Sequence, residues 1–129
     1  MTEKQLKVII RDYADALEKN DTNRALSFFT DDAVWFNPKG IFKGKEELKG
    51  YMAWLFKTVS DMKFVDYGVG IIVQGNKGIF QHIFECTIRG SKIKVPSFCT
   101  YLFNGQKCNT HRTIKIKTND FSLSTNREL

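Results

Sequence analysis

The hydrophobic pattern of this chain changes its period near Lys63, and this change constrains the fold more than any other feature. Before Lys63 the apolar residues recur every three or four positions, which is the spacing of an amphipathic helix. After Lys63 they alternate with polar residues, as in a strand with one buried face. The pattern predicts helices and a short β-like stretch in the first half, in the order helix 3–19, helix 25–29, strand 33–37, helix 45–60. Turn signals divide the second half into four long antiparallel strands, and they stand at 75–76, 90–91 and 104–105.

The alternation also assigns a face to each residue of the predicted strands, provided that each turn is a two-residue loop. Under that register, position 82 faces 69 and 99, and position 99 faces 110. The inward face then carries Tyr67, Val69, Ile71, Phe80, His82, Phe84, Cys86, Val95, Ser97, Cys99, Tyr101, Phe103, Cys108, Thr110, Arg112 and Ile114. The outward face carries Ile72, Ile79, Gln81, Ile83, Glu85, Lys92, Lys94, Phe98, Thr100, Leu102, His111, Lys115 and Lys117.

Helices followed by a long meander indicate an α+β domain, in which three N-terminal helices cover one face of a strongly curved antiparallel sheet. The expected element order is α-α-β-α-β-β-β-β. A length of 129 residues corresponds to one domain, residues 1–129. The chain is 42% hydrophobic and contains 11 Phe, 4 Tyr and 2 Trp, which excludes intrinsic disorder and is enough aromatic material to enclose an apolar chamber.

The cysteines and the N-terminus indicate a cytoplasmic protein. Cys86, Cys99 and Cys108 cannot all pair within one chain and lack the spacing of a redox or zinc motif, which favours a reducing compartment. Charged residues recur through the first helix, where a signal peptide would need an apolar stretch. No run approaches the roughly 20 apolar residues of a membrane span. We therefore expect no membrane association.

Three segments carry a resemblance to a known family. They are the run from Asn20 to Leu26, the segment Phe29–Gly40, which contains the pattern T-D-D-A-V-W-x-x-P, and the segment Phe42–Leu48. Together they resemble the nuclear transport factor 2-like superfamily, and within it the SnoaL-like group that includes polyketide cyclases and ketosteroid isomerases. The segment 103–107 resembles the last hairpin of that family, and 120–123 resembles its tail. The resemblance implies a cystatin-like cone that encloses an apolar pocket, usually in a homodimer.

The same resemblance allows the residues of this chain to be compared with those that two reaction mechanisms require. Ketosteroid isomerases use a carboxylate base, and its position matches Asn37, whose amide cannot accept a proton. Their tyrosine donor matches Tyr13, whereas the position of their protonated aspartate matches Cys99, a poor donor. Epoxide hydrolysis by the limonene-type relatives needs inward carboxylates beside an arginine, and the predicted inward face offers Arg112 without one. Neither of these mechanisms fits the residues.

The candidate catalytic residues are His82, Tyr13 and Asn37. An imidazole on the inward face can act as a base or as a donor. Cys99 would lie directly opposite His82, and a Cys-His pair is the skeleton of a nucleophilic site. The alternative is a structural histidine whose ring is satisfied by tyrosine or water, beside a buried thiol. His82 and Cys86 lie too far apart on one strand to share an ion, so we expect no metal and no cofactor.

A second set of residues is predicted to contact a ligand. Arg112 could hold a carboxylate or phosphate in its planar fork, or it could pair with an acid of the protein or extend outwards at the rim. Trp54 and Phe56 lie on the third helix at a spacing that favours a place in the ordinary core over contact with a ligand. The full predicted set is Trp35, Trp54, Phe56, Phe80, Phe84, Cys99, Tyr101 and Arg112.

The predicted outward face contains an unusual apolar cluster, namely Ile79, Ile83, Phe98 and Leu102. An exposed sheet face should alternate to polar residues, so we expect a second copy of the chain to cover this cluster in a homodimer. The net charge of +6 is spread over helices, loops and outer strands. Because no basic and aromatic motif of an RNA-binding sheet accompanies it, no specific nucleic-acid binding is expected.

Two functional hypotheses follow. The first is a SnoaL-like domain that binds a small, largely apolar molecule, with or without an anionic group. If it is an enzyme, it would be an isomerase, cyclase or lyase that transfers a proton without the carboxylate base of the family, through His82 and Tyr13. The second is a non-catalytic module that uses its pocket or its sheet face for ligand binding or protein assembly.

Overall fold

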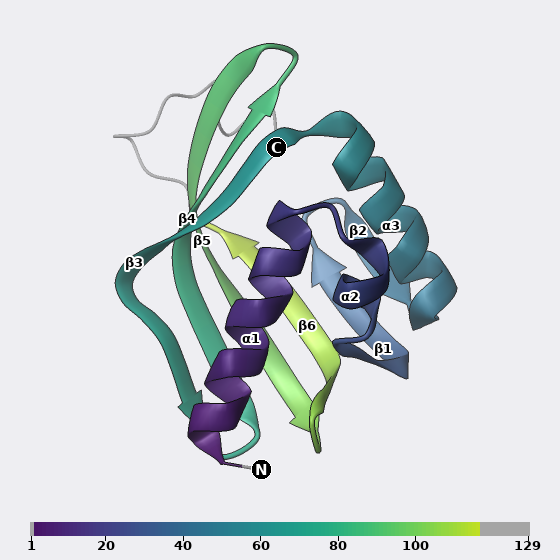
Figure 1. Cartoon of the computed structure of the whole chain (residues 1–129), viewed down its shortest axis with the longest axis vertical. Helices are drawn as coiled ribbons and strands as arrows, with labels where there is room; N and C mark the ends of the chain where they lie inside the picture. The colour runs from purple at the N-terminus through teal and green to yellow at the C-terminus, as the bar shows by residue number, and fades with distance from the viewer. Residues whose placement is uncertain (1, 117–129) are drawn as a thin grey trace.

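The computed structural model describes residues 2–116 and has the expected α+β architecture, with helices packed on one side of a curved sheet (Figure 1). The elements follow in the order α1 Glu3–Glu18, α2 Thr22–Leu26, β1 Phe29–Asn37, β2 Gly40–Lys43, α3 Gly44–Thr58, β3 Ser60–Gln74, β4 Lys77–Ile88, β5 Ser91–Asn104 and β6 Lys107–Lys115. The predicted order lacks β2, a short strand that forms a hairpin with β1 around Pro38. The resemblance of 120–123 to a family tail, and the face assigned to Lys117, lie outside the described residues. None of the described helices is long and apolar enough to cross a membrane.

The strands form one open, mixed sheet in the order β2-β1-β6-β5-β4-β3. The predicted meander β3–β6 is antiparallel throughout, and the front half of the chain extends it because β1 lies parallel to β6. Figure 1 shows α1 crossing the sheet on its concave side, while α3 stands beside β1 and β2. The space between these two helices and the concave face of the sheet is where the site forms.

Helix α1 is held against the sheet by its apolar stripe. Its N-terminus is closed by a capping box, in which Thr2 Oγ1 accepts from the Gln5 amide at 3.1 Å and Gln5 Oε1 accepts from the Thr2 amide at 2.9 Å. A Cβ added at Gly78 on β4 would lie 2.6 Å from Ile10 Cδ1, so a larger residue at position 78 would require the Ile10 side chain to move. This approach buries Tyr13, one turn further along α1, over the concave face.

A β-bulge in β6 changes the predicted faces of the last strand. Phe103 pairs with Cys108, but Leu102 pairs with Thr110, so Asn109 is an extra residue. Because side chains alternate with a period of two, one extra residue moves every later side chain to the other face. The prediction that Arg112 points inward and His111 outward is therefore wrong.

The other two predicted registers also shift. The turn between β4 and β5 is Arg89–Gly90, both at positive φ, so Ile88 pairs with Ser91. A turn one residue earlier changes each pairing by two, which preserves the faces but places Ser97, rather than Cys99, opposite His82. In β3 the register shifts between Asp66 and Ile71, where two glycines have positive φ. Position 69 therefore does not face 82, and the predicted inward residues Tyr67 and Val69 are exposed.

Candidate ligand-binding site

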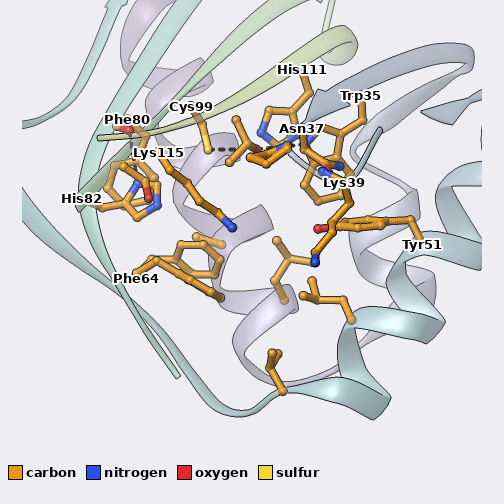
Figure 2. A pocket seen from close by; sticks show the side chains of 18 of the residues that line it. Trp35, Asn37, Lys39, Tyr51, Phe64, Phe80, His82, Cys99, His111 and Lys115 are labelled. Atoms are coloured by element: carbon orange, nitrogen blue, oxygen red, sulfur yellow. Dashed lines mark hydrogen bonds between the residues drawn. The ribbon is translucent and has the colours of Figure 1, made fainter. Parts of the chain in front are cut away.

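The concave face of the sheet, α1 and α3 enclose a cavity of about 150 Å³, which we call the chamber (Figure 2). The exposed residues of its lining mark the mouth, and they are Pro38, Lys39, Trp54 and Arg89. Aromatic and polar residues from α1, β1, β5 and β6 form its closed end, and they are Tyr13, Trp35, Tyr101 and His111. The wall nearest β3 and β4 is formed mainly by Phe64, Phe80, His82 and Phe84.

The structure brings together nine of the eleven residues predicted for the site. All three candidate catalytic residues line the chamber, as do Trp35, Trp54, Phe80, Phe84, Cys99 and Tyr101. Phe56 is absent from the lining, because the helical phase of α3 directs Tyr51, Trp54, Leu55 and Thr58 to the chamber. Arg112 is also absent. It lies on the outer side of β6 with its guanidinium 4.0 Å from the centre of the Phe36 ring.

His111 is the centre of the closed end. Its ring stacks between Trp35 and Tyr101, with ring centroids 4.5 and 4.6 Å apart. Tyr13 meets the same ring edge-on at 5.6 Å. Burial lowers the pKa of His111 to about 3, with a smaller contribution from His82, so the ring is neutral near pH 7. The sequence contained no signal for this position, because it depends on the bulge at Asn109.

Several buried polar atoms around the chamber have no hydrogen-bond partner among the described residues. They are the hydroxyl of Tyr13, Nδ2 of Asn37 and both ring nitrogens of His111. The Lys39 amide donates to Asn37 Oδ1 at 2.8 Å, which orients the side chain and leaves its NH₂ group as a donor. A buried polar group without a partner costs about 1–3 kcal/mol. The chamber therefore has a set of donors and acceptors available to a bound molecule.

Cys99 belongs to a hydrogen-bonded chain rather than to a Cys-His pair. Trp35 Nε1 donates to Thr113 Oγ1 at 2.9 Å, and that oxygen lies 3.5 Å from Cys99 Sγ (Figure 2). The expected direct pairing of Cys99 with His82 is wrong, because Cys99 pairs with Phe80 across the strands. Burial raises the pKa of the Cys99 thiol to about 11, although Thr113 and Tyr101 oppose this shift. Cys99 is therefore a neutral thiol, which is a weak nucleophile.

His82 is held by the backbone of its own strand. Its Nδ1 lies 3.2 Å from the carbonyl oxygen of Phe80, and since a carbonyl only accepts, Nδ1 carries the proton. Phe80 and Phe64 contact the ring, with centroids 4.7 and 5.2 Å away. Burial lowers the pKa of His82 to about 4, while the Phe80 carbonyl and Asp66 act in the opposite direction. A neutral imidazole with this pKa is a weak base near pH 7.

The charged residues of the lining are all basic. Lys39 comes from the β1–β2 turn, Arg89 from the β4–β5 turn and Lys115 from the end of β6, and no carboxylate is among the lining residues that the structure describes. Lys39 Nζ lies 5.3 Å from the centre of the Trp54 ring. In Figure 2 the side chains of Lys39 and Lys115 extend into the chamber from different walls. Sequence reasoning missed both lysines, because Lys115 was assigned to the outer face and Lys39 to a turn.

Metal ligation has no support in the described part of the chain. Within residues 2–116, no three side chains of His, Cys, Asp or Glu come together in a group that could hold a metal ion. Cys86 and Cys108 are free thiols like Cys99, and burial raises their pKa values to about 11 and about 12.

The fold consists of helices that pack over a curved open sheet and enclose a chamber. Comparison with known proteins identifies the family. Residues 10–111 match the family model of the SnoaL-like domain, so the chain belongs to the SnoaL-like domain family. This confirms the resemblance found in the sequence. No curated protein matches the chain.

Solved structures with the same fold come from several bacteria. A protein of Catenulispora acidiphila with a ketosteroid isomerase-like fold, solved in complex with trimethylamine, has a TM-score of 0.77 and 15% identity over 91% of this chain and 90% of its own. A putative SnoaL-like polyketide cyclase of Shewanella denitrificans has a TM-score of 0.77 and 13% identity over 86% and 90%. An LEH-like epoxide hydrolase of M. tuberculosis has a TM-score of 0.75 and 12% identity over 88% and 84%. At these identities the likeness concerns the fold.

Proposed function

We propose that this SnoaL-like domain binds a small, largely apolar molecule with an anionic group in its chamber. The observation that carries the proposal is the distribution of polar groups in the lining. Uncharged, unpartnered donors and acceptors lie among aromatic rings, whereas Lys39, Arg89 and Lys115 are its only described charges. An apolar body would gain aromatic contacts, and an anion would gain charge-assisted hydrogen bonds at the lysines. The role first expected for Arg112 thus passes to Lys39 and Lys115.

The ligands and activities named for the similar structures differ from one another, and the residues of this chain discriminate among them. The relative from C. acidiphila is described with trimethylamine, which is a cation near neutral pH. A chamber whose described charged residues are all basic disfavours a cation by Coulomb repulsion. The epoxide hydrolase and polyketide cyclase activities belong to proteins of 12% and 13% identity. Epoxide hydrolysis by the limonene-type mechanism needs inward carboxylates, and the described lining of the chamber contains none.

A second candidate function is proton transfer of the isomerase, cyclase or lyase type, with His82 as acid or base and Tyr13 as donor. Membership of the SnoaL-like family and the position of His82 in the chamber favour it. A pKa near 4 makes His82 a weak base, and Asn37 offers an amide where the family's carboxylate is expected. Binding is therefore the better supported proposal. With a substrate in hand, unchanged turnover in a folded His82→Ala variant would exclude the catalytic role of His82.

The binding proposal can be tested with phenylacetate, 2-phenylethanol and 2-phenylethylamine. These three ligands share a phenyl ring, and their end groups are anionic, neutral and cationic. Trp35 and Trp54 line the chamber and provide a fluorescence signal. We expect phenylacetate to bind most tightly and the amine least tightly. Because a charge-assisted hydrogen bond contributes about 1.5–3 kcal/mol, Lys39→Met and Lys115→Met should each weaken phenylacetate binding by about tenfold or more. Neither substitution should weaken binding of the alcohol to a comparable extent.

The matched control is Lys94→Met, which removes an exposed lysine from β5 outside the lining and should leave all three affinities unchanged. Equal affinity for phenylacetate and 2-phenylethanol would overturn the anionic part of the proposal. No binding of any of the three would overturn the choice of a small aromatic ligand.

We also propose that the convex face of the sheet pairs with a second copy of the chain. Ile72, Ile79 and Ile114 are 46%, 43% and 41% exposed on this face, and Ile83, Phe98 and Leu102 are partly exposed. We call these six residues the convex patch. Isolated apolar residues on a surface are common, whereas a contiguous set across neighbouring strands is typical of an interface. A two-fold axis would cover the same patch on both copies.

A further inference from the structure

The edge of the His111 ring is the part of this side chain that is left for a hydrogen bond. Trp35, His111 and Tyr101 lie directly opposite one another on the adjacent strands β1, β6 and β5. Their rings are nearly parallel, with interplanar angles of 20° and 22° on the two sides of His111. Because a neighbouring ring covers each face of the imidazole, a further group can approach only the edge, which carries both nitrogens.

The two histidines of the chain differ in how their nitrogens are satisfied. His82 pairs its Nδ1 with the Phe80 carbonyl oxygen at 3.2 Å, as expected of a buried polar group. Both nitrogens of His111 lack a partner among residues 2–116, although this side chain is only 1% exposed. His111 lines the chamber, and Figure 2 shows its ring at one end of it, beside Trp35 and Asn37. A molecule bound in the chamber can therefore supply the missing partner.

We infer that the ligand of the chamber carries a hydroxyl group at the end opposite its anionic group, and that this hydroxyl donates a hydrogen bond to the ring edge of His111. The inference rests on the proposed function, because it concerns the same ligand in the same chamber. It narrows the ligand class to apolar acids that bear a hydroxyl group. It also makes His111 a residue that determines specificity through direct contact with the ligand.

The chemistry of the imidazole favours a hydroxyl group over other polar groups. Burial lowers the pKa of His111 to about 3, so the ring is neutral near pH 7 and has one N–H donor and one bare acceptor nitrogen. A carbonyl oxygen only accepts, and it would leave the bare nitrogen without a partner. An ammonium group could donate, but the described charged residues of the lining are all basic and repel a cation. A hydroxyl group donates to the bare nitrogen without carrying a charge.

The two ends of the chamber determine the order of the groups along the ligand. Lys39 is exposed at the mouth, with its Nζ 5.3 Å from the centre of the Trp54 ring. His111 lies buried at the closed end. Between these ends the lining is aromatic, and the rings of Trp35 and Tyr51 have their centroids 4.9 Å apart. An anionic group would therefore lie at the mouth, the apolar body between the rings and the hydroxyl group at His111.

Pairs of ligands that differ by a single group of similar size test the inference. The pairs are 3-hydroxyphenylacetate with 3-methylphenylacetate, and 4-hydroxyphenylacetate with 4-methylphenylacetate, and isothermal titration calorimetry measures each affinity. We expect the hydroxyl member of at least one pair to bind about three- to tenfold more tightly than its methyl counterpart, which is the effect of one neutral hydrogen bond.

Three variants separate recognition by His111 from a merely structural role. His111→Phe keeps an aromatic ring in the stack and should lower the affinity ratio of hydroxyl to methyl ligand by about tenfold or more, because the hydroxyl group would be buried without a partner. His111→Gln keeps a donor and an acceptor and should retain part of the preference. The control Lys94→Met changes an exposed lysine of β5 and should leave the ratio unchanged.

A measurement on the wild-type protein makes the test independent of how the variants fold. The chain contains two histidines, so ¹⁵N labelling of histidine gives the signals of two imidazole rings, which His82→Phe assigns. The bare nitrogen of His111 should change its chemical shift when the preferred hydroxyl ligand is added. The methyl counterpart should change it much less, because a methyl group cannot donate a hydrogen bond.

The inference and the proposed function fail in distinguishable ways. If neither hydroxyl ligand binds more tightly than its methyl counterpart, in protein that binds phenylacetate, the hydroxyl group is overturned and the anionic ligand stands. An ordered water at the edge of His111 would give this result. A hydroxyl preference that persists in His111→Phe would overturn the role of His111. Binding of 4-methylphenol that depends on His111, without any binding of phenylacetate, would support the hydroxyl group and overturn the anionic group.

Discussion

The two faces of the strands β3–β6 show opposite departures from the usual distribution of polar and apolar residues. The concave face buries both imidazoles, three thiols and several polar atoms that have no partner in the described chain. The convex face exposes the apolar side chains of the convex patch. Buried polar groups and exposed apolar groups both raise the free energy of the isolated folded chain. These departures are the reason why we propose a ligand on the concave side and a second copy of the chain on the convex side.

The largest expected effect is acid destabilisation by the concave face. The folded-state pKa values of His82 and His111, about 4 and about 3, lie below the value of about 6.5 in an unfolded chain. Below pH 6.5 the unfolded chain therefore binds protons that the folded chain excludes, and stability falls as the pH falls. The slope is up to about 1.4 kcal/mol per pH unit for each histidine, so several kcal/mol should be lost between pH 6.5 and pH 4.

Urea unfolding at intervals between pH 7.5 and pH 4 measures this effect. The variant His111→Phe should reduce the slope by about half, because one of the two titrating groups is removed. Substitution of Ile79 by Thr on the convex face should leave the slope unchanged. A free energy of unfolding that is constant over this pH range would contradict the description of the concave face.

The next effect concerns the convex face. Ile79→Lys places a charge in the convex patch and should weaken dimer formation by about tenfold or more, since burying a large apolar side chain contributes about 1.5–3 kcal/mol. The fold should persist because Ile79 is already 43% exposed. Val8→Lys is the matched control, because Val8 is 62% exposed on α1, away from the sheet face. Sedimentation equilibrium distinguishes the two variants, and a wild-type monomer at micromolar concentration would remove the dimer proposal.

The smallest expected effect is on stability, and it concerns the two buried nitrogens of His111 at the closed end of the chamber. His111→Phe keeps an aromatic ring between Trp35 and Tyr101 and removes two buried nitrogens without partners. The free energy of unfolding at pH 7.5 should rise by about 1 kcal/mol, because unsatisfied polar atoms no longer have to be buried. Thermal and urea unfolding provide the measurement. A loss of stability would mean that the nitrogens do have partners in solution.

Much of the site was predictable from the residues themselves. Tyr13 follows from the apolar stripe of α1, and the alternation along β4 and β5 correctly assigned His82, Cys99 and Tyr101 to the concave face, although the partners across the strands were shifted by two. A shift of two preserves the face, so this error had no effect on the composition of the site. The family resemblance matched Asn37 to the position of the family's base, and both Trp35 and Asn37 line the chamber.

The error in β6 changed the composition of the site, because a shift of one residue moves side chains to the other face of the sheet. An extra residue at Asn109 exchanged Arg112 for His111, Thr113 and Lys115 in the lining. The sequence around the bulge has no glycine or proline to signal it. The bulge arises where β6 must pair with β5 on one side and with β1 on the other, and β1 shifts its register in the same region.

The sequence by itself determined the period of each segment, the side of the chain that each helix buries and the apolar character of both sheet faces, because these depend on local spacing. Only the tertiary structure decided which charged groups enter the chamber. Lys39 reaches it because β1 and β2 join the edge of the sheet, and Lys115 reaches it because one residue of β6 is unpaired. Both depend on contacts between segments far apart in the chain, and a periodicity of two carries no information about where such contacts insert or omit a residue.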